Sequence, residues 1–106
     1  MPEAEALYET LAGRMLLHPA VQRGTMMGYP CLRFEGRFFA CQHRQSRGLI
    51  VKLPKERVTA LVESDAGRSF APSGRVFREW VEVAGTDEAA WAARLEEAQA
   101  FAASLA

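Results

Sequence analysis

The spacing of apolar residues changes along the chain, and this change most constrains its fold. Leu7, Leu11 and Met15 recur every four residues, which predicts a helix with one apolar stripe over residues 3–17. Between residues 24 and 53, short runs of aromatic and aliphatic residues replace that spacing, as is typical of strands. The chain therefore combines helices with strands.

Three strands are expected in this middle region, over residues 31–35, 37–42 and 49–53. Glu35-Gly36, between the first two, is typical of a tight hairpin turn. The third run is mostly apolar, so we expect it to lie inside the sheet.

Helical spacing returns after the third strand. Pro54 suits the first turn of a helix, because the N–H that it lacks would have no partner there. Gly67 suits the end of that helix, because glycine takes the left-handed conformation without strain. Thr86 is expected to cap the last helix. The elements predicted in this half are a helix from 54 to 66, a short extra strand near Phe70, a strand over 76–83 and a helix over 87–104.

These elements predict an α+β fold with the order α-β-β-β-α-(β)-β-α. Strands joined by hairpins, with helices at separate points, favour an antiparallel sheet packed by helices over a doubly wound parallel sheet. A chain of 106 residues can bury one hydrophobic core but is too short for two. Residues 1–106 contain no repeat and no linker, so they are expected to form a single two-layer domain.

Charge is balanced over the whole chain but not along it. Thirteen basic residues match thirteen acidic ones, yet residues 14–57 hold nine bases against two acids, and both ends are acidic. We favour acidic helices that lie over basic strands. The alternative is an exposed anion-binding face. Its phosphate contacts would come from Arg33, Arg37, Arg44, Arg47 and Lys52.

The two cysteines, Cys31 and Cys41, lie on the two strands of the predicted hairpin. If Glu35-Gly36 is a two-residue turn, Cys31 faces Ala40 and Cys41 lies on the opposite face of the sheet, so the sulfurs cannot bond. A three-residue turn would place the two cysteines opposite each other. We favour the two-residue turn, which predicts two free, half-buried thiols.

The reactive side chains lack the spacing of familiar sites. His18, Cys31, Cys41 and His43 do not form the close ligand pairs of structural zinc sites. Cys41 and His43 could touch on one strand, but no carboxylate stands nearby in the sequence to orient the histidine. We therefore predict no catalytic residue, no metal site and no cofactor.

The N-terminal segment is acidic, whereas secretory signal peptides begin with a basic segment. The sequence also has no apolar run near the roughly 18–20 residues that span a bilayer. Both features predict a cytoplasmic protein without a membrane partner.

Four segments of the chain resemble, in order, those of the TfoX N-terminal domain family, over about residues 20–103. They are MMGYPCL (26–32), FEGRFFA (34–40), KLPKER (52–57) and GRVFREWV (74–81). This module stands at the front of the competence regulator TfoX and also occurs as small stand-alone proteins, which is the form expected here. YjbR-like (MmcQ) proteins have a related overall shape.

The resemblance implies an α+β fold like that of type III secretion chaperones, and it carries over no catalytic residue. The run Met26-Met27-Gly28-Tyr29 departs from the family's usual Met-Phe-Gly-Gly.

Three hypotheses for function follow. The leading one is a non-enzymatic regulatory or adaptor domain of a bacterial cytoplasm, which binds an unidentified protein or a second copy of itself. The alternative is an accessory domain that binds nucleic acid through the basic stretch 33–57, although the neutral overall charge lacks the usual basic footprint. The third is a small enzyme or ligand-binding domain with a pocket lined by Tyr29, Cys41 and Trp80.

Overall fold

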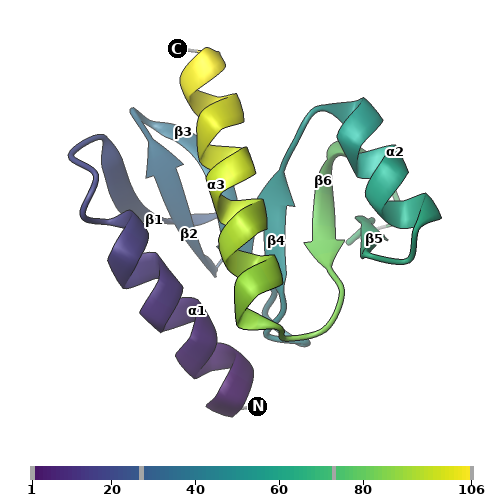
Figure 1. Cartoon of the computed structure of the whole chain (residues 1–106), viewed down its shortest axis with the longest axis horizontal. Helices are drawn as coiled ribbons and strands as arrows, with labels where there is room; N and C mark the ends of the chain where they lie inside the picture. Colours follow the sequence, from purple (N-terminus) through teal and green to yellow (C-terminus); the bar gives the residue numbers. More distant parts are fainter. Residues whose placement is uncertain (1, 27, 73, 106) are drawn as a thin grey trace.

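The computed structural model describes residues 2–26, 28–72 and 74–105, and Met27, part of the first family-like segment, lies outside the described residues. Three helices and six strands follow the order α-β-β-β-β-α-β-β-α (Figure 1). Their bounds are α1 Pro2–Met15, β1 Val21–Met26, β2 Tyr29–Phe34, β3 Arg37–Gln42, β4 Leu49–Lys52, α2 Lys55–Glu63, β5 Gly67–Phe70, β6 Phe77–Val83 and α3 Glu88–Ser104.

The strands form one sheet with the order β1-β2-β3-β4-β6-β5, and every neighbouring pair is antiparallel. The predicted α+β class is therefore confirmed, and β4 lies inside the sheet as expected. The short extra strand near Phe70 is present as β5, at one edge. The finer likeness to type III secretion chaperones stays a prediction.

The sequence analysis missed β1. This strand lies at the other edge of the sheet, and among its six residues only Val21 is fully buried. An edge strand with so little apolar alternation lacks the pattern by which strands are recognised in a sequence.

All three helices pack on one face of the sheet. Their buried side chains share a single core with strand residues such as Leu32, Val51 and Val81. In Figure 1, α3 crosses in front of the middle strands, with α1 on the β1–β2 side and α2 on the β5–β6 side. Trp91 of α3 is fully buried, and its indole N–H donates a 3.0 Å hydrogen bond to the carbonyl oxygen of Gly85. Among the described residues, no helix is long and apolar enough to cross a membrane.

Two helix ends differ from the prediction. Asp87, rather than Thr86, caps α3, since its carboxylate accepts a 2.9 Å hydrogen bond from the backbone N–H of Ala90. Asp65, rather than Gly67, takes the left-handed conformation after α2, with a φ of 62°. Gly67 instead begins β5, where a Cβ would come within 2.7 Å of a core valine side chain.

The β2–β3 hairpin has the two-residue turn that the sequence predicts. Glu35 and Gly36 have φ angles of 49° and 86°, and both must be positive in the type I′ turn that matches the twist of a hairpin. Phe34 and Arg37, on either side of the turn, pair with each other.

One extra residue on β3 then shifts the register. Arg33 pairs with Phe38, but the next pair along the ladder is Leu32 with Ala40, so Phe39 forms a β-bulge. Because side chains alternate between faces, every β3 residue after the bulge points to the face opposite the one an unbroken ladder would give it.

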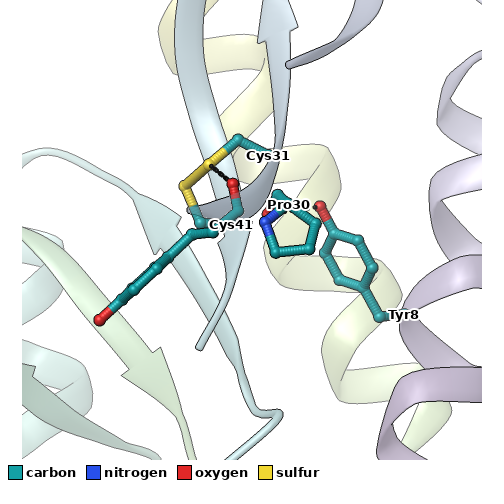
Figure 2. Close-up of a disulfide and its surroundings, with 5 residues drawn as sticks. Tyr8, Pro30, Cys31 and Cys41 are labelled. Atoms are coloured by element: carbon teal, nitrogen blue, oxygen red, sulfur yellow. Dashed lines mark hydrogen bonds between the residues drawn. A yellow bond between two sulfur atoms is a disulfide. The ribbon is translucent and has the colours of Figure 1, made fainter. Parts of the chain in front are cut away.

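The bulge places Cys31 directly opposite Cys41, with their Cα atoms 4.0 Å apart, and the two sulfurs form a disulfide (Figure 2). Both residues are buried, with exposed fractions of 2% and 1%. The prediction of two free thiols on opposite faces is therefore wrong. The two-residue turn was predicted correctly. The bulge, which was not predicted, moves Cys41 to the same face of the sheet as Cys31.

Tyr8 of α1 reaches the same hairpin from the helix side. Its phenol donates a 3.3 Å hydrogen bond to the carbonyl oxygen of Pro30 (Figure 2). Burial raises the pKa of Tyr8 well above its ordinary value, and the nearby carboxylate of Glu9 adds to the rise. The phenol is thus a neutral donor that ties α1 to β2.

A hydrogen-bonded ion pair joins α2 to α3. Arg57 donates from Nε to Oε1 of Glu97 at 2.8 Å and from its terminal nitrogen to Oε2 at 3.2 Å, while Arg94 Nε lies 2.7 Å from the same Oε2. The hydrogen bonds from Arg57 lower the pKa of Glu97 by more than burial raises it, and the charge of Arg94 lowers it further.

We predict that the denatured, unreduced protein contains no titratable thiol and that reduction exposes two. The disulfide closes a loop of about ten residues in the unfolded chain, so its reduction should lower the free energy of unfolding by about 2–3 kcal/mol. Urea unfolding with and without reductant measures this change. Reductant should have no effect on a Cys31→Ala/Cys41→Ala variant, and two thiols found without reduction would disprove the pairing.

Glu97→Gln should lower the free energy of unfolding at pH 7 by no more than about 1 kcal/mol, because the carboxylate and its partner Arg57 are one-third or more exposed. The folded-state pKa of Glu97 is depressed, so the contribution is complete above its unfolded value of about 4.3 and is lost as the pH falls through the folded value. Urea unfolding as a function of pH should show the difference between variant and native protein shrinking in acid. A difference that is constant with pH would contradict the assignment.

Candidate functional site

We call the face of the sheet opposite the helices the helix-free face. It carries a second apolar cluster. Four of its residues are buried and four pack over them while remaining partly exposed. The buried ones are Cys31, Cys41, Ile50 and Phe70, and the partly exposed ones are Met26, Tyr29, Phe38 and Trp80.

This composition is unusual for the outer face of a two-layer fold. An antiparallel sheet with helices on one side normally alternates apolar residues inward with polar residues outward. Here Trp80, whose register partner is Lys52, packs against the buried apolar cluster at a position where a polar residue is usual. A contiguous, partly exposed apolar surface of this kind is typical of interaction sites.

The β-bulge assembles this face. Phe38, before the bulge, and Cys41, after it, both point away from the helices, although they are three residues apart. The bulged Phe39 joins the core on the helix side.

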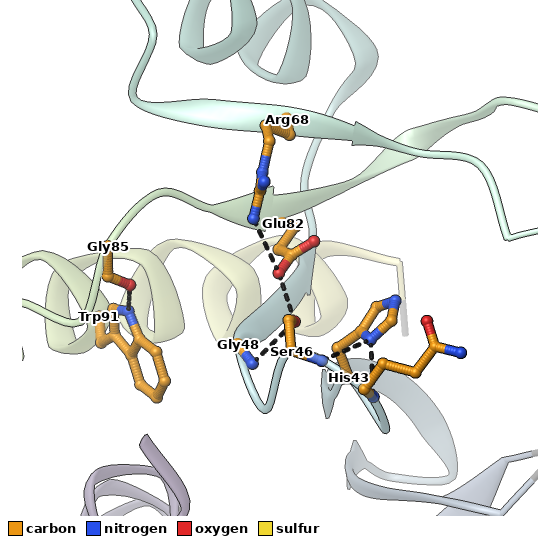
Figure 3. Close-up of polar contacts among 8 residues, drawn as sticks. His43, Ser46, Gly48, Arg68, Glu82, Gly85 and Trp91 are labelled. Atoms are coloured by element: carbon orange, nitrogen blue, oxygen red, sulfur yellow. Dashed lines mark hydrogen bonds and ion pairs between the residues drawn. The ribbon is translucent and has the colours of Figure 1, made fainter. Parts of the chain in front are cut away.

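At one end of the face, three rings pack in tilted and edge-to-face arrangements. Tyr29, His43 and Phe70 have ring centroids 5.7 to 6.5 Å apart. His43 Nδ1 accepts hydrogen bonds from the backbone N–H groups of Gln45 (3.1 Å) and Ser46 (3.3 Å) (Figure 3). In the neutral ring the proton therefore sits on Nε2, which is left as a donor.

A hollow of about 530 Å³ opens beside these rings. Arg44 lines it together with Tyr29 and His43. The guanidinium of Arg44 lies over Gly28, where a Cβ would be 3.6 Å from one of its nitrogens. This end of the face therefore combines aromatic rings with a cation.

His43 and Arg44 lie on the β3–β4 loop, and Glu82 holds this loop against β6 (Figure 3). Ser46 Oγ donates a 2.7 Å hydrogen bond to Glu82 Oε2, and Arg68 donates to the same oxygen at 3.3 Å. The backbone N–H of Gly48 donates to Ser46 Oγ at 3.1 Å. A Cβ at Gly48 would lie 2.6 Å from Glu82 Oε2, so any larger residue would displace this carboxylate.

At the other end, a second hollow of about 320 Å³ lies beside Phe38, Lys52 and Trp80. We call it the β3–β4 hollow. Arg37, at the start of β3, also lines it. Next to this end, the Arg33 guanidinium lies 5.9 Å from the ring centroid of Phe38, and its Nε is buried without a hydrogen-bond partner among the described residues.

Most bases of the central stretch are paired with the acidic ends of the chain. Five of the nine bases in residues 14–57 lie within 2.8 to 4.0 Å of an acid, and each acid belongs to residues 1–13 or 58–106. The pairs are Arg14–Glu88, Arg23–Glu9, Arg47–Glu5, Lys52–Glu79 and Arg57–Glu97. The central bases are thus matched internally by acids of the end segments. Of these pairs, however, only Arg23 of β1 with Glu9 of α1 is the predicted arrangement of a helix acid over a strand base.

The remaining cations are concentrated near the helix-free face. Among the described residues, Arg33, Arg37, Arg44 and Lys55 have no acidic partner within 4.0 Å. Arg33 lies on this face, since it pairs with Phe38, and Arg37 and Arg44 line hollows at its two ends. Lys55 lies on α2, on the other side of the sheet.

The structure therefore brings most of the sequence-predicted site residues together. Tyr29, Cys41 and Trp80, proposed as a pocket, share one apolar cluster, although Tyr29 and Trp80 line different hollows. Of the proposed anion contacts, two do not lie on this face. Arg37 pairs with Phe34 of the helix-side core and lines the β3–β4 hollow, and Arg47 lies 4.0 Å from Glu5 of α1. The sequence analysis did not connect Phe70 with this face, because a register shift in β5 sets its orientation.

The disulfide occupies the thiol that the sequence offered as a nucleophile or metal ligand. The Cys41 sulfur is bonded to Cys31, so in this state it is neither a nucleophile nor a metal ligand. Within residues 2–26, 28–72 and 74–105, no group of three or more His, Cys, Asp or Glu side chains could hold a metal ion.

Comparison with known proteins adds no relative to this description. No protein-family model matches the chain, and no curated protein and no solved structure matches it either. The resemblance to the TfoX N-terminal domain family consequently stays a prediction that rests on the four sequence segments alone.

Proposed function

We propose that this domain is a non-enzymatic adaptor that binds a protein partner on its helix-free face. The observation that carries the proposal is the aromatic surface over the disulfide, where Tyr29, Phe38 and Trp80 are partly exposed. Tyrosine and tryptophan of this kind are enriched among the residues that supply most of the energy of protein interfaces.

The charge around the face specifies the partner further. Arg33, Arg37 and Arg44 have no acidic partner among the described residues, whereas Glu82, the acid on this face, is occupied by Arg68 and Ser46. A complementary surface would therefore carry apolar side chains flanked by carboxylates. A second copy of the same face would bring like charges together, so we propose a different protein as the partner.

Binding of single-stranded nucleic acid remains a second candidate, because aromatic rings and arginines share the helix-free face. Two observations favour the protein partner. The chain has no net charge, and five of the nine central bases are already paired with acids.

The proposal predicts that a displayed library of random peptides will yield binders that combine acidic residues with aromatic or aliphatic ones. Arg44→Glu, an exposed substitution at one end of the face, should weaken the selected peptides by roughly tenfold. Lys55→Glu is the matched control, because it makes the same charge change at an exposed cation on α2, and it should leave binding unchanged.

Fluorescence locates the binding site in the same experiment. Trp91 is fully buried and Trp80 is partly exposed, so acrylamide quenching reports on Trp80. A bound peptide should reduce that quenching. Failure to select any peptide, equal loss in both variants, or unchanged quenching would refute the proposal. Salt-sensitive binding of a mixed-sequence single-stranded oligonucleotide, lost in Arg44→Glu, would replace it with the nucleic-acid alternative.

A further inference from the structure

We infer that the β3–β4 hollow is a binding site for a small apolar carboxylic acid, such as a medium-chain fatty acid or an aromatic acid. This inference goes beyond the proposed adaptor function and does not depend on it.

The hollow exists because two neighbouring strands part. The pairing of β3 with β4 ends at Ala40 and Val51. Beyond that pair, the bulged Phe39 turns to the helix side and Lys52 turns to the other side. The walls of the hollow consequently come from both faces of the sheet, as expected where a bulge bends a strand away from its neighbour.

The helix that covers this gap leaves it unfilled. α3 presents Ala98 and Ala102 here, and both are buried with only a methyl group each. Phe101 and Leu105 of the same helix line the hollow as well. Its volume of about 320 Å³ lies at the lower end of the roughly 300–1,000 Å³ of small-molecule sites.

The remaining wall is mainly aromatic. Phe38, Phe39 and Trp80 line the hollow, and Met26 contributes a flexible apolar side chain. A wall of this kind favours a hydrocarbon chain or a ring, because transfer of such groups from water is favourable and the wall offers few polar partners.

Two cations, Arg37 and Lys52, line the hollow. Arg37 has no acidic partner among the described residues. Lys52 Nζ lies 4.0 Å from Glu79 Oε1, which is too long for a hydrogen bond and leaves its donors available. Two cations against one acid leave an excess positive charge, which matches a singly charged carboxylate head with an apolar tail.

Decanoate is a suitable probe, with decanol as its uncharged counterpart of equal chain length. Titration below the micellar concentration, followed by the fluorescence of Trp80, should show saturable binding at one site. Decanoate should bind roughly tenfold more tightly than decanol, because only the acid pairs with the cations.

Substitutions distinguish binding in the hollow from nonspecific binding of the probes to the protein surface. Arg37→Gln/Lys52→Gln should reduce the affinity for decanoate by roughly tenfold and leave that for decanol unchanged. Lys55→Gln is the matched control and should behave like the native protein. Ala98→Leu should fill the hollow and abolish binding of both probes. If Ala98→Leu does not fold, Arg37→Gln/Lys52→Gln still tests the inference, because it changes only exposed or partly exposed side chains.

Three results would overturn the inference: no saturable binding of decanoate, equal affinity for the acid and the alcohol, or decanoate binding that Arg37→Gln/Lys52→Gln leaves unchanged. Because this test contains no peptide, its failure would leave the proposed partner surface standing, and failure of the peptide selection would leave the hollow standing.

Discussion

The register shift at Phe39 is the constraint on which the rest of the structure depends. A single extra residue in β3 lets Phe39 and Ala40 both join the helix-side core while Phe38 and Cys41 both point to the other face. It places Cys41 opposite Cys31, where a disulfide closes the hairpin. The β3–β4 ladder ends at the residue after the bulge, where the hollow lies between β3, β4 and α3. The disulfide and the place of Cys41 beneath the aromatic surface are therefore two consequences of one irregularity.

Electrostatics explain how a neutral chain can still present a cationic surface. Acids from the two ends of the chain pair with bases of the centre, as Glu9 does with Arg23 and Glu97 with Arg57. These pairs are exposed and each adds little stability. Within the central stretch, they leave Arg33, Arg37 and Arg44 without acidic partners among the described residues, on the helix-free face or in the hollows at its ends. On our proposal, a partner that approaches this face would meet aromatic rings bordered by positive charge. Electrostatics would then select an acidic partner, and the rings would supply the binding energy.

Much of the fold could be predicted from local patterns. The three helices, the hairpin turn and the interior position of β4 follow from periodicity and from Glu35-Gly36. β1 could not be found, because an edge strand that buries only Val21 has no apolar alternation. The bulge could not be found either, because no residue type marks it and a one-residue shift changes which side chains share a face. The predicted pocket residues Tyr29, Cys41 and Trp80 thus share a face, although the register from which Cys41 was placed was wrong.

The measurement that tests this account most directly is the cross-strand contact of Cys31 in solution. In an antiparallel sheet, a facing pair with Cα atoms only 4.0 Å apart brings the two Cα hydrogens into close contact. Nuclear Overhauser spectroscopy should therefore show a strong signal between the Cα hydrogens of Cys31 and Cys41. A strong signal between Cys31 and Ala40 instead would mean that β3 has no bulge. Cys41 would then face the helices, and the disulfide beneath the aromatic surface would not exist.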